Sequence, residues 1–196
     1  MKNDIHIECT ITATSDRLAS RIFKLAANRL LDVNTWSELE GSLISKCTLM
    51  DENGHLVDRN VHQNDYLQIQ RPSEQAANQG KWIKVERVEE IKSNEGMESI
   101  TVLTHASPDP RGTGITNAVR NAEVKRGAFK IVKDGLHVTA GVYAESDPEV
   151  EAANIGDRMR NLSLSAYATL GAYCVQWRSL VNAILGDLDQ GNNLLF

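Results

Sequence analysis

The chain has 196 residues, of which 41% are hydrophobic and 24% charged, a composition typical of globular proteins that fold around one core. Its 26 acidic residues outnumber its 21 basic residues, and the net charge of −5 makes it a poor candidate for binding nucleic acid. The cysteines are too few and too widely spaced for a disulfide framework or a zinc site, and we predict no metal and no cofactor. The first residues form no unbroken apolar segment, so we expect no signal peptide and a cytoplasmic protein.

The first elements in chain order are a strand, a helix and a short helical turn. Apolar and polar residues alternate from Ile5 to Thr14, which predicts a strand with one face in water. The apolar residues then change to helical spacing, and Ser15 or Asp16 can cap the start of this helix. A short helical turn that carries Trp36 follows.

The chain from Ser42 to about Ser146 is strand-like, and it predicts six further strands joined mostly by short links. Asn53-Gly54 and Asp134-Gly135 are residue pairs typical of tight turns. We therefore expect an antiparallel meander. The connection Ala106–Asn121 is long and contains two prolines and two glycines, which makes it a candidate gate over a binding site.

The most apolar segment, near the end of the chain, predicts a long helix. One unbroken helix over residues 147–188 would be about 63 Å long, whereas a globule of this size is about 40 Å across. We therefore expect a break near Asn154 to Gly156 and a main helix over about residues 157–188. Polar residues on one side of this helix exclude insertion into a membrane. Three large aromatic residues lie in its apolar stripe: Tyr167, Tyr173 and Trp177.

The order of these elements resembles the helix-grip fold of the SRPBCC superfamily, which includes the START lipid-transfer domains, the polyketide cyclase/dehydratases and the pollen-allergen group. The local match is "ITATSDRLASRIF" followed by "LLDVNTWSELE", in which Asp32 to Trp36 are similar to a D-V-x-x-W element of that superfamily. The resemblance implies an α+β fold in a single domain over residues 1–196. In that fold a curved, antiparallel, seven-stranded sheet wraps around the long C-terminal helix.

The same resemblance implies that the protein binds or transports a small hydrophobic ligand, such as a lipid or a polyketide-like molecule, in a cavity between sheet and helix. A curved sheet and a straight helix cannot touch along their full length, so side chains or a pocket must occupy the space between them. The candidate ligand-binding residues are six amphipathic aromatic side chains and one histidine: Trp36, Trp82, His105, Tyr143, Tyr167, Tyr173 and Trp177.

Two alternatives remain open. An enzyme of cyclase, dehydratase or hydrolase type would need acid–base groups inside the cavity, and His105 or His137 with Glu86 or Glu123 would be candidates. No residue is assigned a catalytic role, because the chain carries no established catalytic motif. A structural or interaction protein would have a filled cavity. Its apolar end, Asn192–Phe196, would then dock on a partner such as a second copy of the chain, giving a homodimer.

Overall fold

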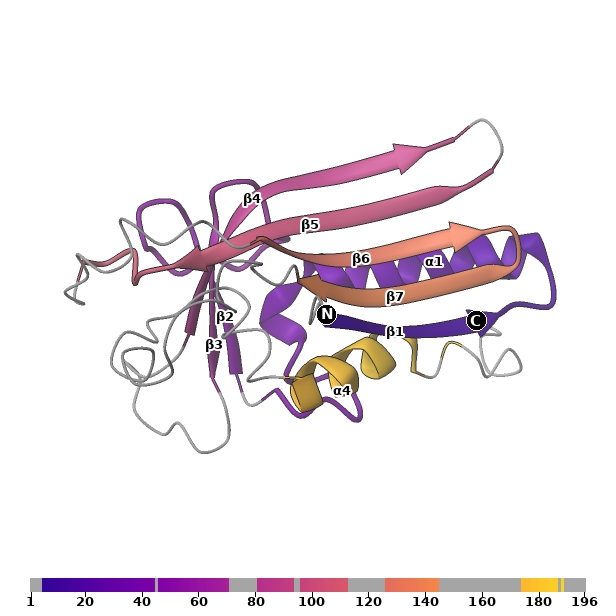
Figure 1. Cartoon of the computed structure of the whole chain (residues 1–196), viewed down its shortest axis with the longest axis horizontal. Helices are drawn as coiled ribbons and strands as arrows, with labels where there is room; N and C mark the ends of the chain where they lie inside the picture. Colours follow the sequence, from indigo (N-terminus) through magenta and orange to yellow (C-terminus); the bar gives the residue numbers. More distant parts are fainter. Residues whose placement is uncertain are drawn as a thin grey trace, which may run out of the picture.

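The computed structural model describes residues 5–44, 46–70, 81–93, 96–112, 126–144, 174–186 and 188, without the side chains of Ile5, Lys81 and Cys174. Figure 1 shows the arrangement of the described elements. In chain order these are β1 (Ile5–Thr12), α1 (Asp16–Leu31), η1 (Val33–Thr35), β2 (Lys46–Met50), β3 (Tyr66–Gln70), β4 (Lys81–Lys92), β5 (Glu98–Ser107), β6 (Arg126–Asp134), β7 (His137–Ala144) and α4 (Cys174–Leu185).

The described strands form one seven-stranded sheet in the order β1-β7-β6-β5-β4-β3-β2. All neighbouring strands are antiparallel, so β2 to β7 form the predicted meander, and β1 lies beside the last strand. The predicted turn between β6 and β7 is confirmed, with Gly135 at a positive φ of 56°. Asn53-Gly54 also forms the predicted turn, but a loop rather than a strand follows it.

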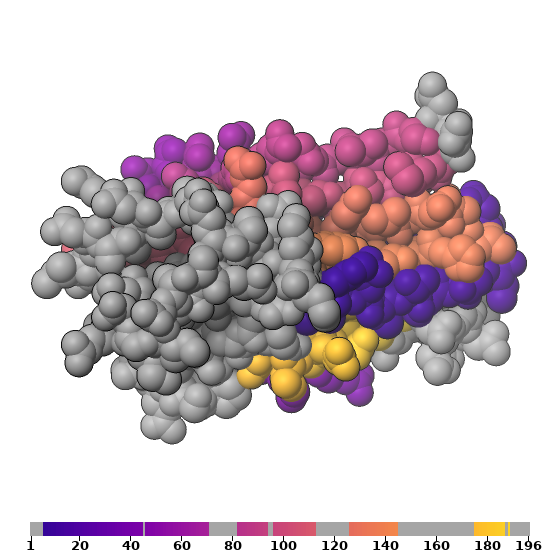
Figure 2. Space-filling view, in the orientation of Figure 1, coloured from indigo at the N-terminus to yellow at the C-terminus, as the bar shows by residue number. Residues whose placement is uncertain are grey.

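The two faces of the sheet differ in what covers them. Phe129 of β6 lies in the core, and we call the face that carries its side chain the inner face and the opposite one the outer face. Because side chains alternate along a strand, Ile131, Val138, Ala140 and Val142 also belong to the inner face, and all of them are buried. Figure 2 views the outer surface, on which β6, β7 and β1 lie side by side.

The sheet changes direction along its length. In Figure 1, β2 and β3 cross the direction of β1, β6 and β7 at a steep angle, and the long strands β4 and β5 connect the two parts. The pairing of β4 with β5 shifts between Val85 and Arg87, so that Glu86 is an extra residue in β4. Such a bulge bends the strand that carries it and increases its twist.

Helix α1 packs on the inner face against β6 and β7. Its start is fixed by Ser15, whose side-chain oxygen accepts a hydrogen bond from the backbone N–H of Leu18, so the predicted cap is confirmed. Its buried residues lie three or four positions apart along the sequence, as expected for a helix with one apolar face: Ala19, Ile22, Phe23, Ala26, Ala27 and Leu30.

The C-terminal helix packs against β1, β7 and α1. The described part of this helix is α4, and residues 157–173 of the predicted helix, with Tyr167 and Tyr173, lie outside the described residues. The helix ends at Leu185, three residues before the predicted end at Leu188. The carbonyls at its end are satisfied by Arg29 of α1, whose Nη1 donates to the carbonyl oxygens of Ala183, Ile184 and Gly186 at 3.2, 3.0 and 2.8 Å.

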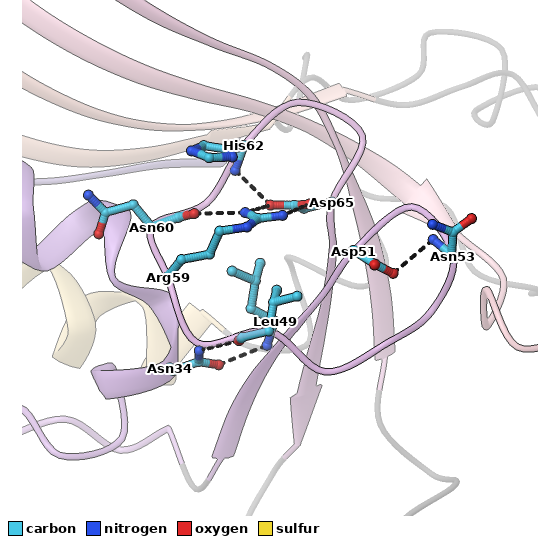
Figure 3. A network of polar contacts seen from close by, with 9 residues as sticks. Asn34, Leu49, Asp51, Asn53, Arg59, Asn60, His62 and Asp65 are labelled. Carbon is cyan, nitrogen blue, oxygen red and sulfur yellow. Dashed lines mark hydrogen bonds and ion pairs between the residues drawn. The ribbon is translucent and has the colours of Figure 1, made fainter.

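A network of polar contacts holds the connection between β2 and β3 (Figure 3). Asn34 of η1 accepts a hydrogen bond from the Leu49 N–H and donates one to the Val57 carbonyl, each at 2.9 Å, so it joins β2 to this connection. The carboxylate of Asp51 accepts from the backbone N–H groups of Asn53 and His55, which closes the turn around Gly54.

No helix within the described part of the chain has the length and apolar character that a membrane span requires.

Candidate functional site

The structure places the predicted ligand-binding residues on opposite sides of the sheet. Trp36 and Trp177 lie in the core on the inner side. Tyr143 alternates with the buried Val142 and Ala144 and therefore points to the outer face. The strand pairing places Trp82 and His105 on that outer face as well. The described residues of the predicted set thus form two separate groups rather than one wall.

Trp36 and Trp177 pack against Phe129 in the space between the sheet and the helices. Their rings contact the ring of Phe129 from two sides, with centroid distances of 5.3 and 5.2 Å. The three side chains are 1, 0 and 1% exposed in the order Trp36, Trp177 and Phe129. The Trp36 indole N–H also donates to the carbonyl oxygens of Arg29 and Leu30 at the end of α1. Here α4 is in direct contact with the sheet.

A second apolar region of the inner face lies on β3, β4 and β5. The described helices pack mainly on β1, β6 and β7, and η1 packs on β2. Strands β3, β4 and β5 lie between β2 and β6 in the sheet. One buried hydroxyl belongs to this region, since the Thr104 side chain donates to the Gly127 carbonyl at 3.3 Å. We call the region the β3–β5 inner face, and its buried side chains are Leu67, Ile69, Ile83, Val85, Val102 and Thr104.

Cys47 of β2 lies near this region and is buried. Burial raises the pKa of the Cys47 thiol to about 12, because the thiolate would lose its hydration. A thiol of that pKa stays protonated at neutral pH and does not act as a nucleophile.

An ion pair beside the start of β3 was missed by the sequence reasoning. The guanidinium of Arg59 donates to both carboxylate oxygens of Asp65, at 2.6 and 2.9 Å, and the His62 backbone N–H donates to the same carboxylate at 2.7 Å (Figure 3). The Asp65 side chain is only 3% exposed. Since three donors already satisfy this carboxylate, its clearest role is to fix the loop before β3.

Tyr143 belongs to a polar cluster on the outer face of β1 and β7. Its hydroxyl donates a short hydrogen bond to Glu8, and the His6 Nε2 lies 2.9 Å from the same carboxylate oxygen. The Tyr143 hydroxyl and then His6 lower the pKa of Glu8, while burial and Glu8 raise the pKa of Tyr143. A Cβ atom at Gly141 would lie only 2.5 Å from the Tyr143 hydroxyl, so glycine leaves room for the ring.

Trp82 is covered on the outer face by the chain that follows β5. The guanidinium of Arg111 lies 5.3 Å from the Trp82 ring centroid, and Asp109 holds that guanidinium with hydrogen bonds of 2.6 to 3.2 Å. The backbone of Arg111 also lies beside Gly54, whose Cβ, if present, would be 3.2 Å from an Arg111 side-chain atom. These contacts tie the turn after β2 to the segment after β5.

His105 lies at the end of β5 among charged side chains. It pairs directly with Lys84 and Arg126, and Arg126 donates to the Glu86 carboxylate at 3.0 Å. Burial lowers the pKa of His105 from its ordinary value of 6.5; Glu86 opposes this shift, and Lys84 and Arg126 add to it. Glu86, named as a potential partner of His105 from the sequence, is therefore close to it, but on the outer face.

The second candidate histidine, His137, does not join His105. His105 pairs with Arg126 at one end of β6, whereas His137 pairs with Asp134 at the other end. Eight residues of β6 separate these positions, which corresponds to about 27 Å. The side chain of His137 instead contacts the Thr12 hydroxyl at 2.9 Å. Glu123 lies outside the described residues, within which no cluster of three or more histidine, cysteine, aspartate or glutamate residues is arranged to hold a metal ion.

No model of a known protein family matches the chain. No curated protein matches it in sequence either. Several solved structures match over most of the chain with TM-scores below 0.5. A hypothetical protein from Helicobacter pylori matches with a TM-score of 0.46 and 11% identity, over 91% of this chain and 86% of its own. Norcoclaurine synthase from Thalictrum flavum, in complex with dopamine and hydroxybenzaldehyde, matches with a TM-score of 0.42 and 12% identity, over 94% and 85%.

The Zhui aromatase/cyclase from Streptomyces sp. R1128 matches with a TM-score of 0.43 and 13% identity, over 96% of this chain and 95% of its own. The antiparallel meander of β2 to β7 and the packing of the C-terminal helix against the sheet are those expected from the sequence. The chain is therefore an α+β protein with the helix-grip arrangement, in which an antiparallel seven-stranded sheet packs against a C-terminal helix.

Proposed function

We propose that the protein binds a small hydrophobic molecule against the β3–β5 inner face. The observation that carries this proposal is the composition of that face, which presents five apolar side chains and one hydroxyl. The described helices pack mainly on the neighbouring strands. An apolar wall with few polar groups is typical of sites for apolar ligands, in which a single polar group fixes orientation.

The packed aromatic side chains define one border of the proposed site. Phe129 of β6 packs against both Trp36 and Trp177, so the ligand would lie beyond these rings, toward β4. Tyr167 and Tyr173 stay candidates for the helix side of the site, because they precede Trp177 in the predicted helix. Trp82, His105 and Tyr143 are not part of this proposal, since they point to the outer face.

The Thr104 hydroxyl is the polar group that we assign to ligand orientation. It donates to the Gly127 carbonyl and keeps lone pairs that accept a hydrogen bond from a ligand hydroxyl. A sterol-like or polyketide-like molecule with one hydroxyl group fits this combination better than a pure hydrocarbon. A single domain over residues 1–196 stays part of the proposal.

Two substitutions of valine by phenylalanine, at positions on opposite faces of the sheet, test the proposal. Val85 points into the proposed site, and Val132 of β6 points to the outer face. If the site is open, the ring in Val85→Phe occupies ligand volume. Two displaced methylene groups at about 0.8 kcal/mol each would then weaken binding about tenfold. Val132→Phe is the matched control and should leave binding unchanged. Fluorescence titration with a dansyl-labelled fatty acid measures the affinity, and urea unfolding measures the stability.

The stability of Val85→Phe decides between an open site and a filled one. With space at the site, the added ring is tolerated and the unfolding free energy stays close to that of the wild type. In a filled core, overpacking costs about 1–3 kcal/mol. A destabilised or unfolded Val85→Phe, or a wild-type protein that does not bind the probe, would count against the proposed function.

A further inference from the structure

A row of polar side chains crosses four strands on the outer face. Tyr66 of β3 pairs with Lys84 of β4, Lys84 pairs with His105 of β5, and His105 pairs with Arg126 of β6. Residues directly opposite each other on antiparallel strands have Cβ atoms about 4.5–5.5 Å apart and share one face of the sheet. We call these four residues the outer-face row. It lies on the side of the sheet opposite to the proposed site for a hydrophobic molecule.

The donors of the outer-face row are largely unused among the described residues. The Lys84 ammonium lies 5.2 Å from the Tyr66 ring centroid, and no described carboxylate pairs with it. The His105 Nδ1 atom is buried and has no hydrogen-bond partner. Arg126 donates to Glu86 through its Nε, and no contact of the outer guanidinium nitrogens with another described residue is seen.

The charges of the outer-face row are not balanced locally. Lys84 and Arg126 are both cationic and flank the same histidine, while Glu86 supplies one negative charge. Lys84 and Arg126 lie two strands apart, one on each side of His105, so an anion held between them would be attracted to both. The whole chain carries a net charge of −5, so this local excess of positive charge runs against the general balance of the protein.

We propose that the outer-face row binds a phosphate group. A phosphate dianion matches the two flanking cations in charge, and its oxygens can accept hydrogen bonds from Lys84 and Arg126 at the same time, beside the His105 ring that lies between them. A carboxylate has two oxygens and one charge, and it satisfies this set of donors less completely. The phosphate would belong either to a small soluble molecule or to the headgroup of a phospholipid.

Titration with inorganic phosphate, followed by the NMR signals of the His105 ring nitrogens, tests the proposal. Lys84→Gln removes one cation and should weaken binding by roughly fivefold or more, since a lost hydrogen bond to a charged group costs about 1 kcal/mol or more. Glu86→Gln removes the competing carboxylate and should strengthen binding. The two opposite effects distinguish a site at this row from a change in general fold.

Lys130→Gln provides the matched control. Lys130 also lies on the outer face of β6, four residues or about 13 Å from Arg126, and it is not part of the row. Its replacement removes the same charge and should leave phosphate binding unchanged. Equal weakening by Lys84→Gln and Lys130→Gln, or no saturable change at His105 in the wild type, would overturn the proposal. Circular dichroism of each variant confirms that the fold is kept.

Two further arms separate the possible sources of the phosphate. Phenyl phosphate represents a soluble monoester, and phosphatidylcholine vesicles containing phosphatidic acid represent a membrane surface. Binding to either one that is weakened by Lys84→Gln and not by Lys130→Gln supports the proposal and identifies the source. Absence of binding to both, together with no response to inorganic phosphate, contradicts it. This outcome leaves the proposed hydrophobic site untouched, because that site lies on the inner face.

Discussion

Replacing Phe129 by leucine should loosen the attachment of α4 to the sheet. The Phe129 ring contacts Trp36 at 5.3 Å with an angle of 49° between the ring planes, and Trp177 at 5.2 Å with an angle of 74°. Such tilted and edge-to-face pairs each contribute about 0.5–1.5 kcal/mol beyond the area they bury. Phe129→Leu removes both pairs and leaves a small void.

The expected loss follows from these contacts. Two ring pairs account for about 1–3 kcal/mol, and the smaller side chain adds roughly 0.5–1 kcal/mol for the void. We therefore expect the unfolding free energy to fall by about 1.5–4 kcal/mol, a large share of the ~5–15 kcal/mol typical of globular proteins. Urea unfolding, followed by far-ultraviolet circular dichroism and by tryptophan fluorescence, measures this loss.

Ile131→Leu is the control for this experiment. Ile131 is fully buried on the same strand and the same face, and its replacement by leucine keeps the volume and should cost less than about 1.5 kcal/mol. A double-mutant cycle of Phe129→Leu with Trp177→Leu should give a coupling energy of about 0.5–1.5 kcal/mol. The reasoning is refuted if Phe129→Leu costs no more than Ile131→Leu, or if the cycle shows no coupling.

Three further predictions concern single side chains. Arg29→Met should lower the unfolding free energy, measured in urea, by about 2 kcal/mol, because the carbonyls at the end of α4 lose a charged donor. An unchanged unfolding free energy would show that water replaces the guanidinium as donor. Gly141→Ala should cost about 1 kcal/mol in the same assay by displacing the Tyr143 ring, and in a Tyr143→Ser background the cost should vanish. The lowered pKa of His105 means that the unfolded chain binds its proton more tightly, so stability should fall as the pH drops below 6.5. His105→Gln should reduce this loss between about pH 7 and pH 5 in urea titrations, and an unchanged pH profile would speak against the shift.

Local features of the fold follow from the sequence because neighbouring residues determine them. The alternation of Ile7 with Glu8 predicts the two faces of β1, and the structure buries Ile7 and exposes Glu8. Ser15 stands directly before a helical pattern and caps it. Gly135 supplies the positive φ that the turn between β6 and β7 requires. In each case, a few adjacent residues decide the conformation.

Which face of a strand lies inward depends on contacts that are distant in sequence. The alternation around Tyr143 and His105 shows that each of these side chains points to the face opposite that of its neighbours along the strand. It does not show which of the two faces the helices cover. The structure answers this through Phe129, which contacts Trp36, directly after η1, and Trp177 of α4. The choice of aromatic residues as ligand-binding candidates therefore combined side chains from both faces of the sheet.

The outer-face row required information that the sequence pattern lacks. The position of His105 beside Lys84 depends on the register of β4 and β5, and the extra residue Glu86 changes that register within the pair. Its position beside Arg126 depends on how β6 returns after a long connection. The Arg59–Asp65 ion pair was missed for a different reason, since charged residues in a loop are usually exposed.

Native mass spectrometry of the protein purified from its own host tests the proposed function most directly. Ions of the folded protein should carry an additional small mass, and mild denaturation should release an apolar molecule in a ratio of about one per chain. Trp177 and Phe129 should show changed NMR signals when this molecule is removed, because they border the proposed site. Ions with only the mass of the chain, together with no binding of lipid-like or sterol-like molecules added afterwards, would contradict the proposal.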